Sequence, residues 1–163
     1  MAKISGFSVE EGKIPKLSLR DWVLAIIQDK EKRKNKDAIF IMNEVFIFVN
    51  EVVPSLKSEF DFKSAWCGPY SEKVVKSLEH FIDAKVLEVK ESKSTAIGFT
   101  YELTESGAKK ASEITSKLPA SLRDKIEFLK TAVSHMGPTG MFQYIYSIYP
   151  EYVFLREGGE NIV

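Results

Sequence analysis

The chain reads WCGPYSEKVVKSLEHFIDAKVLEV from residue 66 to residue 89 and, after a short polar segment, FTYELT from residue 99 to residue 104. Gly68 and Pro69 predict a helix start, because proline suits the first helical turn, and Ser71 or Gly68 would cap that helix. The apolar residues recur at helical spacing and predict one buried face, made of Val74, Val75, Leu78, Phe81 and Ile82. The polar residues are expected on the solvent face: Glu72, Lys73, Lys76, Ser77, Glu79 and Asp83.

Two short strands are predicted after this helix, at residues 86–89 and 99–104, with a polar loop between them. Helix, strand, loop and strand in this order end a winged helix-turn-helix domain. In such a domain the helix enters a DNA groove and the loop forms the wing. The fold expected is therefore α+β and mostly helical, with a winged helix-turn-helix core, a small antiparallel sheet and extra C-terminal helices.

The segments GPYSEKVVKSLEHFIDAKVLEV and YELTESG resemble the C-terminal half of the winged-helix module in PadR-like regulators. They resemble still more the phage-associated YwgA-like proteins and their Panacea-type, antitoxin-associated relatives. The element order extends this resemblance over residues 18–154, and SIYPEYV is similar to a tyrosine-proline ending in the YwgA-like proteins. The resemblance implies a winged-helix fold and, through it, DNA binding.

Composition limits the possible partners. Lysine and arginine together number 23, as do aspartate and glutamate, so no global positive field draws the protein to nucleic acid and a DNA site must be a local patch. One cysteine excludes an internal disulfide, and two distant histidines argue against a zinc site. The first nine residues lack the pattern of a signal peptide. These features predict a cytoplasmic protein without a metal or other cofactor.

The N-terminal third predicts an arm and then a helix. Residues 1–17 are interpreted as an arm that places Phe7 and Ile14 on a neighbouring surface. Ser18 followed by Asp21 resembles a capping box and predicts an amphipathic helix to residue 29. The next segment, residues 30–37, is the most basic short run in the chain. It is either a solvated connection between helices or a loop whose Arg33, Lys34 and Lys36 contact phosphates.

Residues 38–53 are almost continuously apolar, interrupted only by two pairs one heptad apart: Asn43, Glu44, Asn50 and Glu51. A helix with this pattern shows a narrow polar stripe and buries the rest, as a core helix or a helix shared with a second subunit would. It is too short to span a membrane. Pro54 is expected to end it.

Alternation of apolar and polar residues predicts a strand at residues 59–66, with Phe60, Phe62 and Trp66 on one buried face. We expect this strand to pair with the wing strands in a three-stranded sheet. Cys67 is interpreted as a small buried hydrophobe, with a redox-active thiol near the helix start as the alternative.

Two further helices are predicted in the last third. Thr104 would cap one to residue 117, and a second would begin near Pro119 and end near His135, with Leu122, Ile126, Leu129 and Val133 buried. After a Gly-Pro-rich turn comes a segment dense in aromatics. This segment either packs on the core or forms a dimer or partner surface, and base stacking is a third possibility. The residues of such a surface would be Phe142, Tyr144, Tyr146, Tyr149 and Tyr152.

Enzyme motifs are absent: the sequence holds no Gly-rich phosphate loop, zinc-protease motif, nucleophile elbow or Cys-x-x-Cys pair. We expect a DNA-binding winged-helix protein that regulates transcription as a homodimer on double-stranded DNA and does not bind a membrane. The expected DNA contacts are Lys73, Lys76, Ser77 and His80 on the helix, Lys90 and Lys93 in the wing, and Arg33, Lys34 and Lys36 on the backbone. The alternative is a protein-interaction module, an antitoxin-like or phage-associated adaptor that does not bind DNA. An enzyme or a small-molecule sensor is the third reading.

The predicted organisation has four parts: an N-terminal arm (1–17), a winged-helix domain (18–117), a C-terminal helical extension (118–156) and a tail (157–163).

Overall fold

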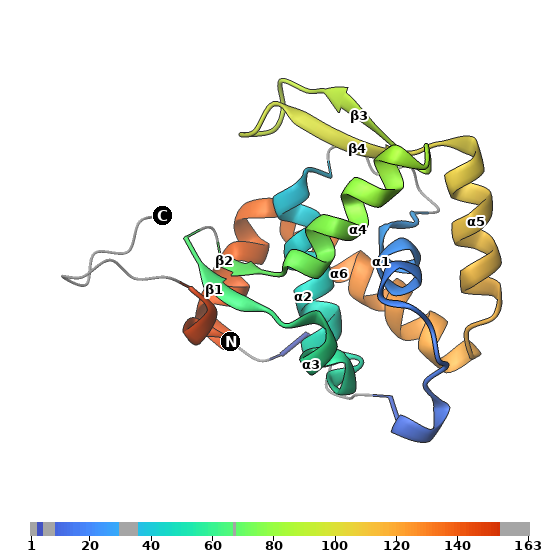
Figure 1. Ribbon diagram of the computed structural model, residues 1–163. Coiled ribbons are helices and arrows are strands. Elements are labelled where there is room, and N and C mark those ends of the chain that lie inside the picture. The colour runs from blue at the N-terminus through green and yellow to red at the C-terminus, as the bar shows by residue number, and fades with distance from the viewer. Residues whose placement is uncertain (1–2, 5–8, 30–35, 67, 154–163) are drawn as a thin grey trace.

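The computed structural model describes residues 3–4, 9–29, 36–66 and 68–153, and the expectations for Phe7, Arg33, Lys34, Cys67 and the tail lie outside these ranges. Helices form most of the described chain, and two separate antiparallel hairpins complete it (Figure 1). The predicted mostly helical α+β class is confirmed.

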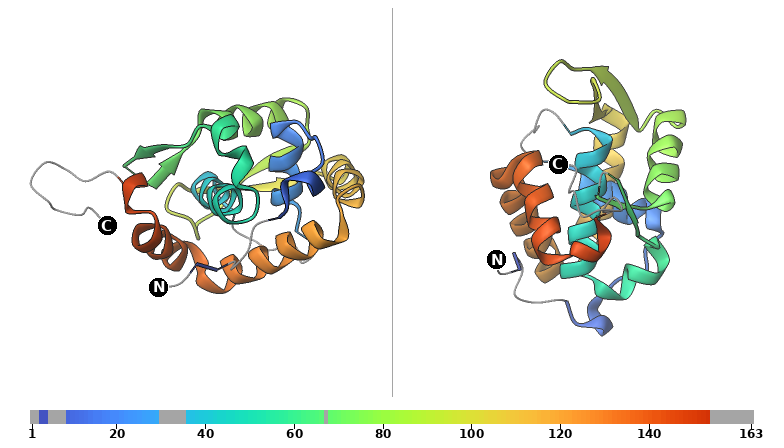
Figure 2. Two further views of the ribbon diagram at one scale, coloured as in Figure 1. Left: turned by 90° about the horizontal axis from the view of Figure 1, so that it is seen from below. Right: turned by 90° about the vertical axis from the view of Figure 1, so that its left-hand side faces the viewer.

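Helix α2 (Ala38–Glu51) lies at the centre of the fold, with α4 on one side and α6 on the other (Figure 2). Asp37 caps it by accepting a hydrogen bond from the Phe40 backbone N–H at 2.8 Å. The prediction of a core helix is confirmed, but the expected solvent-facing polar stripe is wrong. All four polar residues of α2 are buried, because α1, α4, α6 and strand β2 pack around it: Asn43, Glu44, Asn50 and Glu51.

Helix α1 (Leu19–Ile27) packs against α2, α4 and α5. Its predicted cap is confirmed, since the Ser18 hydroxyl accepts the Asp21 backbone N–H at 3.1 Å. The arm before it also contacts α2. Val9 is buried and its backbone N–H donates to the Val52 carbonyl at 3.0 Å; between Val9 and α1 lies a short 3₁₀ turn, η1 (Glu11–Lys13).

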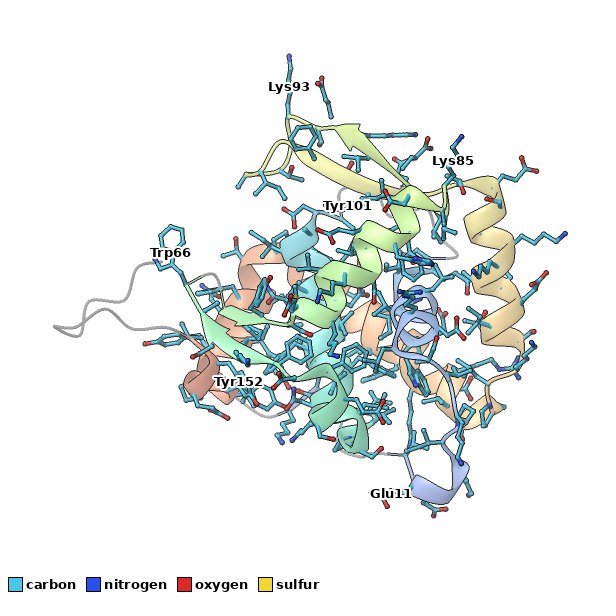
Figure 3. The ribbon with its side chains drawn as sticks, in the orientation of Figure 1. Glu11, Trp66, Lys85, Lys93, Tyr101 and Tyr152 are labelled. Atoms are coloured by element: carbon cyan, nitrogen blue, oxygen red, sulfur yellow. The ribbon has the colours of Figure 1, made fainter. Side chains whose placement is uncertain are left out.

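The segment between α2 and α4 differs from the prediction. It contains the 3₁₀ turn η2 (Pro54–Leu56), the short helix α3 (Lys57–Phe60) and the strands β1 (Lys63–Ala65) and β2 (Gly68–Tyr70). Of the strand predicted at residues 59–66, only residues 63–65 are extended, and residues 59 and 60 belong to α3. Phe60 is buried at the end of α3, whereas Trp66 is 59% exposed and points away from the molecule (Figure 3).

Strand β1 pairs with β2 and not with the wing, so the expected three-stranded sheet is also wrong. Gly68 and Pro69 belong to β2 and do not open the next helix, because Gly68 has a φ of 104°, a left-handed value that favours glycine. Helix α4 (Glu72–Asp83) begins after Ser71, whose hydroxyl donates to the Phe60 carbonyl and makes no cap.

From α4 onward the predicted order is confirmed. Strands β3 (Leu87–Glu91) and β4 (Phe99–Leu103) pair antiparallel, with Leu87 opposite Leu103 and Glu91 opposite Phe99. We call this hairpin, with its loop at residues 92–98, the wing. Thr104 then caps helix α5 (Glu105–Ser116) by accepting the Gly107 backbone N–H at 3.0 Å.

Helix α6 (Ala120–Ile148) consists of two helical halves, and the first ends close to the end predicted near His135. A break separates the halves at Gly137, whose φ of 67° and ψ of −179° are not helical, and Pro138 follows it. The predicted buried face of the first half is confirmed: Leu122, Ile126, Leu129 and Val133. After the second half, the turn η3 (Pro150–Tyr152) leads to Val153, which forms a parallel bridge with Ala65 of β1.

Among the described residues, no single helix is both long and apolar enough to cross a bilayer; α2 meets those criteria only together with the segment from Pro54 to Phe60, from which it is bent by 116°.

Gly107 provides a test of the packing between α5 and the wing. A Cβ atom at this position would lie 2.0 Å from the Val86 carbonyl oxygen. We expect Gly107→Ala to lower the free energy of unfolding by about 1–3 kcal/mol, because the backbone of α5 must move away from Val86. Urea denaturation measures this, with Gly12→Ala as the control, since a Cβ atom there meets nothing within 4 Å. Equal stability of the two variants would contradict the close contact.

Candidate helix–wing interface and buried polar clusters

The exposed side of α4 carries part of the expected DNA-contacting set. Lys73 and Lys76 are exposed as predicted, and Lys76 forms an ion pair with Glu72 at 3.0 Å. Ser77 is a correction, because it is buried and its hydroxyl donates to the Lys73 carbonyl at 2.8 Å. His80 is half-buried, with its ring edge-on to Phe81. The helix thus exposes two of the four predicted side chains, and one of these, Lys76, is already paired with a carboxylate.

The wing lysines differ from each other. Lys90 donates to Glu102 at 2.6 Å and lies 3.6 Å from Glu88, and the hydrogen bond to Glu102 raises the pKa of the Lys90 ammonium. Lys93, in contrast, is exposed and points away from the wing tip (Figure 3). Only Lys93 therefore offers a wing ammonium that is not already paired with neighbouring carboxylates.

Lys36 is a second correction to the expected DNA contacts. Its side chain is buried, and its ammonium lies 3.0 Å from Glu44 and 3.4 Å from Asp29. Its backbone carbonyl accepts the Tyr101 N–H at 2.8 Å, which ties the wing to the start of α2. Lys36 stabilises the core and does not reach a phosphate. This burial could not be predicted from the sequence, because Lys36 lies at the end of a run of charged and polar residues.

We call the exposed surface of α4 and the wing the helix–wing face. Its lysines are Lys73, Lys76, Lys85, Lys90 and Lys93. Carboxylates lie among them on the same elements: Glu72, Glu79, Asp83, Glu88, Glu91 and Glu102. The positive charges are thus interrupted by at least as many negative ones, and the face carries no local basic patch.

Large apolar side chains are exposed at both hairpins, on a scale that the sequence did not reveal. On the wing, Val89, Ile97 and Phe99 are 44%, 41% and 47% exposed. On the β1–β2 hairpin, Trp66 and Tyr70 are also exposed. The alternation of side chains along a strand predicts that Val89 and Phe99 lie on the same side of the wing. Only the fold shows that this side is exposed.

The aromatic C-terminal segment packs on the core, one of the interpretations left open above. Tyr144 and Tyr149 are buried, so their assignment to a dimer or partner surface is wrong, while Phe142, Tyr146 and Tyr152 are half-buried. The cause is Glu51 at the end of α2. Its carboxylate accepts hydrogen bonds from the hydroxyls of Tyr144 and Tyr149, the latter at 3.1 Å.

The same network reaches the N-terminal arm. The Tyr144 oxygen accepts the Ile4 backbone N–H at 2.8 Å. Burial raises the pKa of both tyrosine hydroxyls, and the nearby Glu51 charge raises it further. Both hydroxyls therefore stay protonated and act as donors.

A second buried cluster surrounds Glu44, one heptad before Glu51. Besides Lys36, it includes Lys130 of α6, whose ammonium donates to the carbonyls of Ala25, at 3.2 Å, and Gln28 at the end of α1. Burial lowers the pKa of Lys130 to about 8, against the opposing effect of Glu44. Glu51 thus fixes the second half of α6 against α2, whereas Lys130 joins the first half to the end of α1.

No group of three or more His, Cys, Asp or Glu side chains suited to a metal ion occurs within the described ranges. Comparison with known proteins gives no further assignment, since no family model and no curated protein matches this chain.

Lys130 makes stability depend on pH in a defined direction. Its folded-state pKa of about 8 lies below the unfolded value of 10.5, so between these values the unfolded chain binds more protons and stability rises with pH. We expect Lys130→Met to remove a rise of about 2 kcal/mol between pH 8 and pH 10. Above pH 10 the raised tyrosine pKa values act in the opposite sense, because the unfolded tyrosines then lose protons first.

Urea denaturation across this pH range measures the slope. Lys110→Met, at an exposed position of α5, is the control and should keep the wild-type slope. An unchanged slope in Lys130→Met would mean that Lys130 is fully charged in the folded state throughout this range.

Proposed function

We propose that this chain is a protein-interaction module of winged-helix type, and that its partner docks on the side of the wing that carries Val89 and Phe99. The observation that carries the proposal is the set of exposed apolar side chains on the wing: Val89, Ile97 and Phe99. Exposed apolar groups gathered on one hairpin are typical of protein-binding surfaces. The resemblance to YwgA-like and Panacea-type proteins, with their antitoxin association, supports the same reading.

Charge supports a protein partner over a DNA backbone. A duplex presents a dense array of phosphates and rewards clustered, unpaired cations. On the helix–wing face, Lys76 and Lys90 are already paired with carboxylates, and Glu79, Asp83 and Glu91 would repel phosphates. A protein surface with apolar side chains and a mixed polar rim meets no such penalty.

Site-specific crosslinking in the protein's native cells tests this proposal. p-Benzoylphenylalanine in place of Phe99 is expected to give a discrete protein adduct on irradiation. The control is the same substitution at Phe128, which is 54% exposed but lies on α6, on the opposite side of α2 from α4 (Figure 2). The adduct's mass distinguishes a second copy of the 18.5 kDa chain from a different protein. Identical products at positions 99 and 128, or none at either, would contradict a docking surface on the wing.

DNA binding, as a dimeric transcription regulator, is a second candidate. It is favoured by the exposure of Lys73 and Lys76 on the helix that precedes the wing, together with Lys93 at the wing tip. Of the predicted DNA contacts that lie within the described residues, these three ammonium groups are the ones that a duplex would meet. The resemblance to PadR-like regulators supports this alternative.

Fluorescence anisotropy with a mixed pool of genomic duplexes, at low and near-physiological salt, tests the second candidate. If the protein binds DNA through α4, Lys73→Glu with Lys76→Glu should weaken binding by about tenfold or more, because two phosphate contacts are replaced by repulsion. Lys109→Glu with Lys110→Glu on α5 is the matched control. DNA binding that is equal in both double variants would exclude α4 as the DNA-contacting helix.

A further inference from the structure

Strand β3 forms the outer edge of the wing. Its neighbour β4 is bonded on both edges, because β3 pairs with one edge and the Lys36 carbonyl accepts the Tyr101 N–H at 2.8 Å on the other. Among the described residues, no strand pairs with the second edge of β3. The strand is also exposed from Glu88 to Glu91. An uncovered edge of this kind can pair with a further strand.

The hydrogen bonds of the wing show which backbone groups of β3 face the open edge. The Ser92 N–H donates to the Gly98 carbonyl at 2.8 Å, and the Thr104 N–H donates to the Val86 carbonyl at 3.0 Å. In an antiparallel pair the residues that bond to the neighbouring strand alternate with residues that do not. Every second residue of β3 therefore directs its N–H and C=O groups to the open edge: Leu87, Val89 and Glu91.

The charges of β3 select one register for pairing with a second copy of the same strand. Two identical antiparallel strands are related by a two-fold axis, which can lie at residue 88, 89 or 90. An axis at Glu88 or at Lys90 sets that residue opposite its own copy, and like charges directly opposite are destabilising. An axis at Val89 instead sets Glu88 opposite the partner's Lys90, and Lys90 opposite the partner's Glu88. Only this register gives opposite charges in both pairs.

The backbone groups fit the same register. With the axis at Val89, this residue pairs with the partner's Val89, and Leu87 pairs with the partner's Glu91. These are the residues whose N–H and C=O groups face the open edge, so each outward donor meets an outward acceptor. The charged residues between them then form the pairs that are not hydrogen-bonded, in which the side chains lie closest together.

The two charged side chains are accessible from the open edge. Glu88 is 51% exposed and Lys90 is 49% exposed. Lys90 already contacts Glu102 of β4 at 2.6 Å, but its ammonium group has three N–H donors. A carboxylate that arrives on the open side of β3 therefore finds a donor without displacing Glu102.

We propose that two copies of this chain pair antiparallel through β3 about Val89 and join their wings into one continuous sheet. The open edge of β3 and the side of the wing that carries Val89 and Phe99 are separate surfaces, so the dimer does not rest on the partner proposed above. The joined sheet carries the Val89 and Phe99 sides of both wings on one side. Because the strand is short, the interface is small, and we expect a Kd on the order of 100 µM.

Paired charge reversals test the register by sedimentation equilibrium of the full 18.5 kDa chain, at up to about 1 mM. Lys90→Glu and Glu88→Lys each set like charges opposite one another in both pairs, so each variant alone should dimerise about tenfold or more weakly than the wild type. An equimolar mixture of the two should recover the wild-type affinity, since each strand then faces opposite charges. Lys110→Glu, at an exposed position of α5, is the control and should dimerise as the wild type does.

Two results of this experiment would overturn the proposal. One is a wild-type chain that stays monomeric at about 1 mM. The other is a mixture that dimerises no more tightly than the single variants, because the recovery depends on cross-strand charge pairing and not on the folding of either variant.

Residue-resolved amide exchange by NMR tests the backbone contacts. The amides of Val89 and Glu91 face the open edge and should exchange about threefold or more slowly at about 1 mM than at about 50 µM. The amide of Ala96, in the wing loop, should exchange equally at both concentrations. Exchange at Val89 and Glu91 that does not depend on concentration would contradict pairing through β3.

A proline variant separates the backbone contact from the side chains. Val89→Pro removes the N–H that faces the open edge and keeps the bonds to β4, so it should abolish dimerisation. Val89→Thr retains the N–H and the β-branched shape and is its control. Wild-type affinity in a folded Val89→Pro variant would overturn the proposal; if that variant does not fold, the exchange of the Val89 and Glu91 amides decides.

Discussion

Two carboxylates buried on one helix fix how the rest of this protein packs. Glu44 and Glu51 lie one heptad apart on α2 and are 1% and 4% exposed, so bulk water solvates neither carboxylate. A buried charge requires a partner within hydrogen-bonding distance. Glu44 has an ammonium group, that of Lys36, and Glu51 has the hydroxyls of Tyr144 and Tyr149. These partners come from the segment before α2 and from the second half of α6, which are thereby fixed to the central helix.

The break in α6 is consistent with this arrangement. Lys130, in the first half, extends across to the end of α1, while Tyr144, in the second half, turns toward Glu51. Gly137 and Pro138 let the two halves take different directions, and a cavity lies at the break between α2, α6 and the wing tip. Packing of α6, burial of α2 and formation of the cavity are therefore linked through the same polar contacts.

On the outside, local ion pairs balance the charge of the helix–wing face. Two of its lysines are paired with nearby carboxylates. Lys76 pairs with Glu72, one helical turn away, and Lys90 pairs with Glu102 on the facing strand. The exposed apolar side chains Val89 and Phe99 lie on the opposite side of the wing from Glu88, Lys90 and Glu102, because successive residues of a strand point to opposite faces.

The sequence by itself determined the elements whose causes are local. Residues within one or two turns of each other determine the caps of α1 and α5 and the apolar periodicity of α4 and α6. They also determine the wing hairpin and the core position of α2. Lys73, Lys76 and Lys93 were correctly predicted to be exposed for the same reason. Tertiary structure alone decided the burial of Lys36, Ser77, Tyr144 and Tyr149, the pairing of β1 with β2, and the cavity at the break in α6. These features depend on contacts between segments distant in the chain, and the residue types of a single segment do not specify which distant segment will cover it.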